Sequence, residues 1–73
     1  MNETLHYSIL IQWSDEDQRY VVVLPEWEDL CAMPVSDGAT REEAARKGSE
    51  VLDTLIRITK EDGKPLPSPH TFD

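Results

Sequence analysis

The chain has little cysteine and glycine and no long hydrophobic run. Among its 73 residues are one cysteine and three glycines. With Cys31 alone an intrachain disulfide is excluded, and three isolated glycines exclude a glycine-rich phosphate-binding loop. The longest apolar run, residues 21–24, is far shorter than the roughly 20 residues of a membrane-spanning helix. With no recognisable secretory signal, we expect a cytoplasmic protein that does not enter a membrane.

The small size predicts a single domain spanning residues 1–73. A chain of this length buries only about 60 % of the surface that it exposes when unfolded. Hydrophobic residues make up 38 % of the sequence, so a core is possible but thin. Because disulfides cannot supply the missing stability, we expect a homodimer or a higher homo-oligomer.

The negative charge is concentrated in the first half of the chain. The formal net charge is −8, and residues 1–40 carry eight acidic residues against Arg19 alone. Residues 41–61 carry five acidic and five basic residues and are neutral. An acidic surface repels nucleic acid and attracts a basic partner, so we expect no direct binding of nucleic acid. The alternative is that the charge serves only solubility.

Two antiparallel strands are predicted near the N-terminus. Residues 5–13 alternate between apolar and other side chains, which predicts a strand with one buried face. Residues 19–24 are rich in β-branched side chains and predict a second strand. The short polar connection over residues 14–18 permits only antiparallel pairing. The apolar face of the first strand is Tyr7, Ile9, Ile11 and Trp13.

A third strand and one long helix complete the predicted fold. Pro25 ends the second strand, residues 31–35 can form a short strand, and Pro34 places that strand at an edge. Residues 36–38 are then a turn. The predicted helix spans residues 41–61, and an extended proline-rich tail spans residues 64–73. The order β-β-β-α predicts an α+β fold, in which one helix packs on a small antiparallel three-stranded sheet.

Local signals mark both ends of the helix. Thr40 is a good N-cap, and Glu43 three residues later completes a capping box. Gly63 suits the C-terminal cap, and Pro65 prevents continuation. Gly48 in mid-helix predicts a close approach of the helix to the sheet. The face predicted to pack on the sheet is Ala44, Gly48, Val51, Leu52, Leu55 and Ile58 or Thr59.

The sequence predicts no enzyme, metal site or cofactor site. His6, Cys31 and His70 are scattered, with no chelating spacing between any two of them. We interpret Cys31 as a small packing residue, not a nucleophile. The acidic run over residues 15–17 lacks the glycine and the spaced ligands of a calcium-binding loop.

Trp27 allows two interpretations. A large aromatic side chain among Glu26, Glu28 and Asp29 could anchor a protein partner. The alternative, which we favour, is that it covers the small core of the chain itself.

The ordered set of sequence features resembles the HicB-like antitoxin family of type II toxin–antitoxin systems. The matching features are Tyr7, Tyr20-Val21-Val22, Leu24-Pro25, Cys31, Gly38, Thr40, Glu42-Glu43-Ala44, the amphipathic helix, Gly63 and Leu66-Pro67-Ser68-Pro69. The chain departs from the family at Leu30, where a glycine commonly stands, and at Gly38-Ala39-Thr40, where the glycine is commonly closer to the threonine. The Met33-Pro34-Val35 segment is also unusual for the family.

The resemblance implies a reduced ribonuclease H-like fold without ribonuclease activity. It also implies a partner, a small basic HicA-type ribonuclease whose RNA-binding and catalytic surface the antitoxin covers. We expect a stand-alone form without a DNA-binding domain, and therefore no direct repression of an operon. The alternative is an orphan homo-oligomeric binding module of the same fold with no toxin partner. The residues expected to contact a partner are Asp15, Glu16, Asp17, Glu26, Trp27, Glu28 and Asp29.

Overall fold

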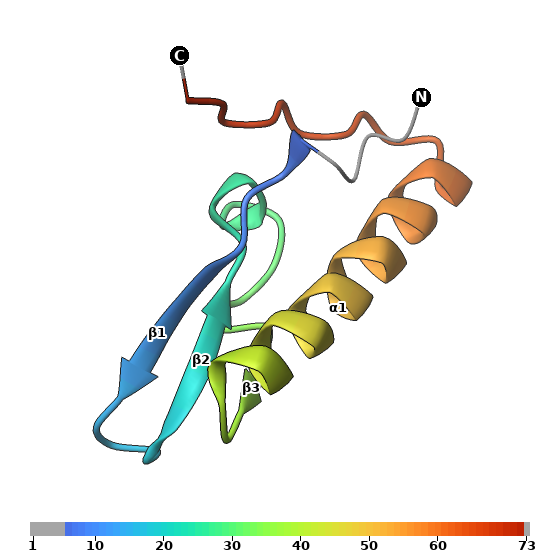
Figure 1. The fold of residues 1–73 in the computed structure, drawn as a ribbon. Helices are drawn as coiled ribbons and strands as arrows, with labels where there is room; N and C mark the ends of the chain where they lie inside the picture. Colours follow the sequence, from blue (N-terminus) through green and yellow to red (C-terminus); the bar gives the residue numbers. More distant parts are fainter. Residues whose placement is uncertain (1–5, 73) are drawn as a thin grey trace.

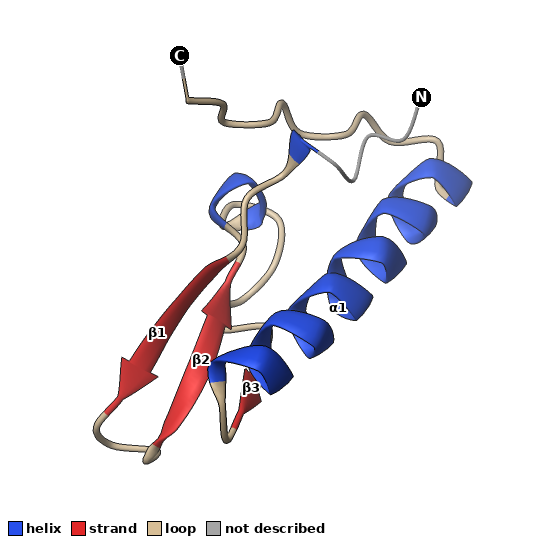
Figure 2. Ribbon diagram, in the orientation of Figure 1, coloured by secondary structure: helices blue, strands red, loops and turns tan. Residues whose placement is uncertain are grey.

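The computed structural model describes residues 6–72 as a small antiparallel sheet with one long helix lying across it (Figure 1). Figure 2 shows the strands on one side of the molecule and the helix on the other. The sheet order is β1-β2-β3, and both strand pairs are antiparallel. The predicted α+β class is confirmed. The elements are β1 Leu10–Ser14, β2 Arg19–Val23, the 3-10 helix η2 Pro25–Trp27, β3 Ser36–Gly38 and α1 Arg41–Glu61.

The first strand begins later than predicted. Residues 6–9 form no strand, and Leu5 lies outside the described residues. The cause is a competing partner, because the backbone N–H of Ser8 donates to both carboxylate oxygens of Glu26, at 3.2 Å each. Strand pairing starts only at Leu10, which lies opposite Val23.

The prediction of a third strand at residues 31–35 is wrong. The strand lies at Ser36–Gly38, which we predicted as a turn. The backbone N–H of Cys31 donates to the carbonyl of Trp27, closing a turn, and Pro34 has no N–H to donate. Within residues 31–35, the first backbone N–H that bonds to the sheet is that of Val35, which donates to the carbonyl of Val22 at 2.9 Å.

The bounds of α1 agree with the prediction at both ends. Thr40 is the N-cap, and its hydroxyl oxygen accepts a hydrogen bond from the backbone N–H of Glu43 at 3.1 Å. The returning bond differs from a standard capping box, because the Glu43 carboxylate accepts from the backbone N–H of Ala39 at 2.6 Å. This bond is the main reason that the pKa of Glu43 lies below its ordinary value.

One hydrophobic core lies between the sheet and α1. The helix approaches the sheet closely at Gly48, as predicted, because a Cβ there would lie 2.8 Å from Cγ1 of Val22. Ile56 is buried although we did not place it on the packing face. Of the two alternatives Ile58 and Thr59, Thr59 is half-buried and Ile58 is exposed. The buried apolar side chains of the core are Val22, Leu24, Trp27, Ala44, Leu52 and Ile56.

The helix does not cover the whole sheet. It packs mainly on β3 and β2 and touches β1 least, and Figure 1 shows β1 at the side away from α1. The buried face of β1 is therefore only partly covered. Trp13, which we expected on the buried face, is 48 % exposed.

The segment after α1 folds back across the end of the sheet where β1 begins and β2 ends. Residues 64–72 form no helix or strand, and they pass beside the start of β1 (Figure 1). The hydroxyl of Tyr7 donates to the carbonyl of Pro67 at 2.6 Å. The backbone N–H of His70 donates to the Glu26 carboxylate at 2.8 Å. Two separate hydrogen bonds thus fix this segment to residues near the ends of the β1–β2 hairpin.

Candidate functional site

The residues predicted to bind a partner do not form one surface. Asp15, Glu16 and Asp17 lie in the loop that joins β1 to β2. The remaining four follow β2, in and after η2, at the opposite end of the hairpin (Figure 1). A partner that covers the hairpin loop would meet a different side of the molecule from one that covers η2.

Two of the seven residues are buried inside the chain. Trp27 is 1 % exposed and packs against Tyr7, with ring centroids 5.6 Å apart. The structure therefore shows the role that we favoured for Trp27, as part of the core. Glu26 is 8 % exposed, and its carboxylate is occupied by hydrogen bonds from Ser8 and His70. Neither side chain is presented to a partner, whereas Glu28 and Asp29 are exposed.

The Glu26 carboxylate stays ionised despite its burial. Burial by itself would raise its pKa. Hydrogen bonds from the backbone N–H groups of His70, Glu26 itself and Ser8, and from the hydroxyl of Ser8, outweigh this and hold the pKa below its ordinary value. The side chain acts as a fixed anion that joins η2 to the segment before β1 and to the C-terminal segment.

An aromatic and cationic cluster lies at the hairpin end of the sheet. Trp13 and Tyr20 are cross-strand partners whose rings meet edge to face, with centroids 5.1 Å apart. The guanidinium carbon of Arg41, in the first turn of α1, lies 5.1 Å from the centroid of the Tyr20 ring. Trp, Tyr and Arg are the side chains that most often dominate the energy of protein interfaces.

The hairpin loop adds unpaired negative charge to this cluster. Asp15 accepts a hydrogen bond from Nε1 of Trp13 at 2.9 Å, which fixes the indole beside the loop. Within the described part of the chain, the carboxylates of Asp15, Glu16 and Asp17 make no salt bridge. We call the group the hairpin-end surface and define it as Trp13, Asp15, Glu16, Asp17, Tyr20 and Arg41.

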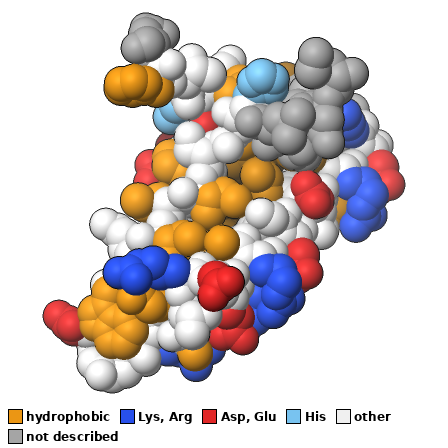
Figure 3. Space-filling view, in the orientation of Figure 1, with side chains coloured by type: hydrophobic (Ala, Val, Ile, Leu, Met, Phe, Trp, Pro, Cys, Tyr) orange, Lys and Arg blue, Asp and Glu red, His pale blue; other side chains and the backbone are white. Residues whose placement is uncertain are grey.

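Figure 3 shows the same arrangement from outside. Hydrophobic side chains gather at the hairpin end of the molecule, with a basic group over them and acidic groups beside them. A further apolar band runs from this end along the gap between β1 and α1. The band follows from the incomplete cover that α1 gives to β1.

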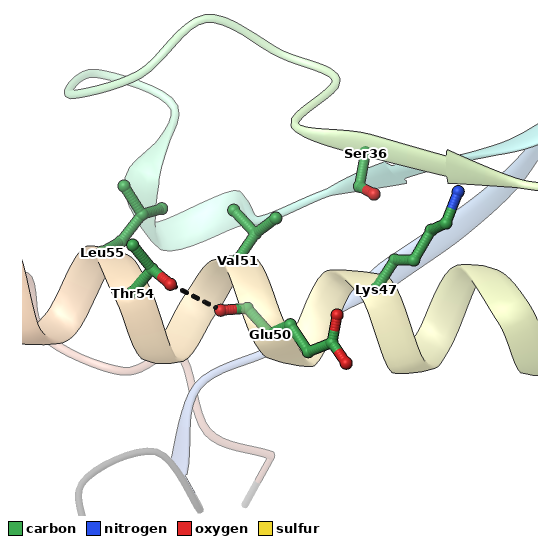
Figure 4. A pocket seen from close by; sticks show the side chains of 6 residues that line it. All are labelled: Ser36, Lys47, Glu50, Val51, Thr54 and Leu55. Carbon is green, nitrogen blue, oxygen red and sulfur yellow. Dashed lines mark hydrogen bonds between the residues drawn. The ribbon is translucent and has the colours of Figure 1, made fainter.

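Two depressions in the surface lie along α1. The first, of about 320 Å³, lies between β3 and α1 (Figure 4). Lys47 and Glu50 lie at its rim, and the hydroxyl of Thr54 donates to the backbone carbonyl of Glu50 at 3.0 Å. Among the described residues that line it there is no histidine or cysteine. The Thr54 hydroxyl is therefore engaged with the helix backbone and not with a base.

The second depression, of about 220 Å³, lies at the C-terminal end of α1. It is lined mainly by apolar side chains, among them Trp27 and Leu30, together with the half-buried Cys31. No histidine is among its described lining residues, so this lining offers Cys31 no imidazole base. Packing remains the better interpretation of this cysteine.

Other classes of site find no support in residues 6–72. No group of three or more histidine, cysteine, aspartate or glutamate side chains could hold a metal ion there. None of the helices in this range is long and apolar enough to cross a membrane.

Comparisons with known proteins identify no relative. No protein-family model, no curated protein and no solved structure matches the chain. The resemblance to HicB-like antitoxins therefore stays an interpretation of the sequence.

Sequence reasoning missed three members of the hairpin-end surface. Trp13 was expected on the buried face of its strand, Tyr20 was assigned to a strand rich in β-branched residues, and Arg41 was placed only as the first residue of the predicted helix. One signal was present, because Trp13 stands directly before the polar loop, where a strand leaves the core. The contact of Arg41 with Tyr20 joins residues 21 positions apart in the sequence and depends on where α1 crosses the sheet.

Proposed function

We propose that this chain is a HicB-like antitoxin, which binds a small basic HicA-type mRNA-cleaving toxin and covers its RNA-binding and catalytic surface. The observation that carries the proposal is the hairpin-end surface. Within residues 6–72, it combines an exposed Trp13, an Arg41 stacked on Tyr20, and a loop whose carboxylates form no salt bridge. A surface that binds RNA carries positive charge, so an acidic surface with an aromatic centre is complementary to it.

The proposal is tested first by co-expression. A short basic protein encoded next to this chain is the candidate toxin; it is expressed alone and with this chain, and growth and complex formation are measured. Rescue of growth together with a stable complex supports neutralisation by binding. A toxic neighbour that neither binds nor is rescued would overturn the proposal, and the orphan homo-oligomeric module would then explain the fold better.

Charge reversal tests which acidic loop makes the contact. The matched variants are Glu16→Lys with Asp17→Lys at the hairpin end, and Glu28→Lys with Asp29→Lys after η2. All four side chains are exposed, and both doubles change the net charge equally. We expect the hairpin double variant to bind at least about tenfold more weakly, mainly through a slower association rate, and the η2 double variant to bind almost normally. An equal loss of affinity in both double variants would contradict the assignment of the contact to the hairpin end.

Removal of Trp13 tests the aromatic centre of the surface. We expect Trp13→Ala to weaken the complex by about 2 kcal/mol, roughly 30-fold, as for a central interface tryptophan. The matched control is Leu30→Ala, because Leu30 is exposed at the other end of the hairpin. Titration calorimetry measures both, with circular dichroism to confirm folding. An unchanged affinity for Trp13→Ala would exclude the residue from the interface.

A further inference from the structure

The edge of the sheet at β1 lacks the features that normally protect a sheet edge. Edge strands of monomeric proteins are commonly short, or carry lysine, proline or a bulge that blocks pairing with another chain. β1 reads LIQWS and contains none of these residues. Residues 8–14 are all uncharged, although 30 % of the chain is charged.

The opposite edge of the sheet is protected. β3 has only three residues. Its Asp37 lies 3.4 Å from Nε of Arg19 and 3.7 Å from Nζ of Lys47, so charged side chains surround this edge. Within residues 6–72, protection is therefore absent at the β1 edge and present at the β3 edge, and the difference identifies β1 as the edge that can accept a strand.

The hydrogen-bond pattern shows which backbone groups of β1 are open. The carbonyl of Val22 accepts from Val35, so the polar groups of Val22 face the β3 side. In an antiparallel ladder the N–H and C=O groups of successive residues point to opposite sides of the strand. The groups of Val21 and Val23 therefore face β1, where their partners are Gln12 and Leu10. On β1 the same alternation turns the N–H and C=O groups of Ile11 and Trp13 away from the sheet.

The open edge is continuous with the hairpin-end surface. Trp13 belongs to both, because its backbone faces the free edge and its half-exposed indole lies over the helix-facing side. Asp15 follows β1 directly and marks its end with negative charge. Tyr7 and Ser8 contact the C-terminal segment or Glu26, so the accessible edge begins beyond them.

We propose that β1 accepts an edge strand of the basic partner, which extends the sheet by backbone hydrogen bonds to Ile11 and Trp13. The inference rests on the proposed function for the nature of the partner. The partner's strand is itself uncharged along β1 and carries lysine or arginine where it passes the hairpin loop. A second copy of this chain is a poorer occupant, because each copy carries a net charge of −8 and repels the other.

Amide hydrogen exchange distinguishes strand addition from contact by side chains alone. In the isolated chain, the amides of Leu10 and Gln12 are protected by the β1–β2 ladder, whereas those of Ile11 and Trp13 exchange freely. In the complex with the basic neighbouring protein we expect the amides of Ile11 and Trp13 to slow by at least about tenfold, as inter-strand hydrogen bonds require.

A pair of substitutions separates the backbone from the side chain at the same position. Ile11→Pro removes the outward-pointing backbone N–H together with the isoleucine side chain. Ile11→Ala shortens the side chain but keeps the backbone N–H. Since this N–H is outside the β1–β2 ladder, both variants are expected to fold, which urea unfolding checks. We expect Ile11→Pro to bind at least about tenfold more weakly than Ile11→Ala. The exchange measurement on the unmodified chain decides the question if Ile11→Pro does not fold.

Each outcome bears on a different claim. A complex in which the Ile11 and Trp13 amides exchange as in the isolated chain would overturn strand addition and leave the proposed function standing. Protection that grows with concentration in the isolated chain would show that a second copy occupies the edge, contrary to this inference. Absence of any complex with the toxic neighbour would overturn both the proposed function and the strand addition that rests on it.

Discussion

Gly38→Ala should strongly destabilise the protein, because the backbone of α1 lies directly against this glycine. A Cβ at position 38 would lie 2.5 Å from the backbone nitrogen of Ala44 and 2.9 Å from its Cα. Backbone atoms at the start of a helix cannot move aside as a side chain can, so the helix itself must shift. We expect a loss of at least about 3 kcal/mol, at the upper end of the usual cost of overpacking. A chain of 73 residues has about 4–11 kcal/mol of unfolding free energy in all.

The matched control for this substitution is Gly63→Ala. Gly63 has a φ of +70° but no atom within 4 Å of the added Cβ, so only backbone strain of about 1 kcal/mol is expected. Urea unfolding followed by circular dichroism measures both variants. A loss at Gly38 no larger than the loss at Gly63 would show that α1 does not approach β3 as closely as the structure indicates.

The same substitution has a consequence for the hairpin-end surface. Gly38 lies opposite Tyr20 in the sheet, and Arg41 begins α1 three residues later. A shift of the helix start would move Arg41 away from the Tyr20 ring. If enough Gly38→Ala protein folds at low temperature, we expect its partner affinity to fall along with its stability.

Glu26→Gln should destabilise the fold by about 2–3 kcal/mol and release the C-terminal segment. The carboxylate accepts from the backbone N–H groups of Ser8 and His70 and from the hydroxyl of Ser8. The glutamine amide has one acceptor oxygen in place of two. Its NH2 group is itself a donor and cannot accept the hydrogen bonds of Ser8 and His70. Hydrogen bonds to charged groups contribute about 1.5–3 kcal/mol, and buried donors left without an acceptor add to the loss. The exposed neighbouring substitution Glu28→Gln is the control and should change stability little.

Two measurements follow the loss of this carboxylate. Urea unfolding gives the change in free energy, and amide hydrogen exchange reports on Ser8 and His70 directly. We expect both amides to exchange faster in Glu26→Gln while the α1 amides stay protected. Unchanged exchange at His70 would show that the C-terminal segment is held by other contacts, such as that of the Tyr7 hydroxyl with Pro67.

The contribution of Glu26 should depend on pH with a definite sign. The pKa of the folded state lies below the ordinary value of 4.5, so the unfolded chain takes up the proton first as the pH falls. The stabilisation is fully present above pH 4.5 and is lost as the pH falls through the lower pKa of the folded state. The difference between the original chain and Glu26→Gln should therefore be constant near neutral pH and shrink below 4.5. A difference that widened on acidification would contradict the depressed pKa.

The residues that could be predicted are those whose structure depends on near neighbours in the chain. Alternating β-branched residues and a short polar loop determine the β1–β2 hairpin. Thr40 and Gly63 determine the ends of α1, because capping bonds join groups a few residues apart. The charge asymmetry, which suggests the kind of partner, is likewise a property of the sequence alone.

The tertiary structure decided the features that depend on distant residues. Trp27 allowed two interpretations, and packing against Tyr7 decided for the core. Glu26 was expected to contact a partner, but it is buried and accepts hydrogen bonds from Ser8 and His70. These contacts join residues up to 44 positions apart, and no local signal encodes the return of the C-terminal segment.

The position of the helix across the sheet decided which surface is open. Gly38 was predicted as a turn residue, but it lies in β3 where α1 touches the sheet. Contact at β3 and β2 leaves β1 partly uncovered, exposes Trp13 and brings Arg41 over Tyr20. The sequence determined which residues form each element, because alternation and capping act locally. Only the packing of one element on another determined which side chains and which strand edge remain available for binding, because packing depends on the shapes of both surfaces.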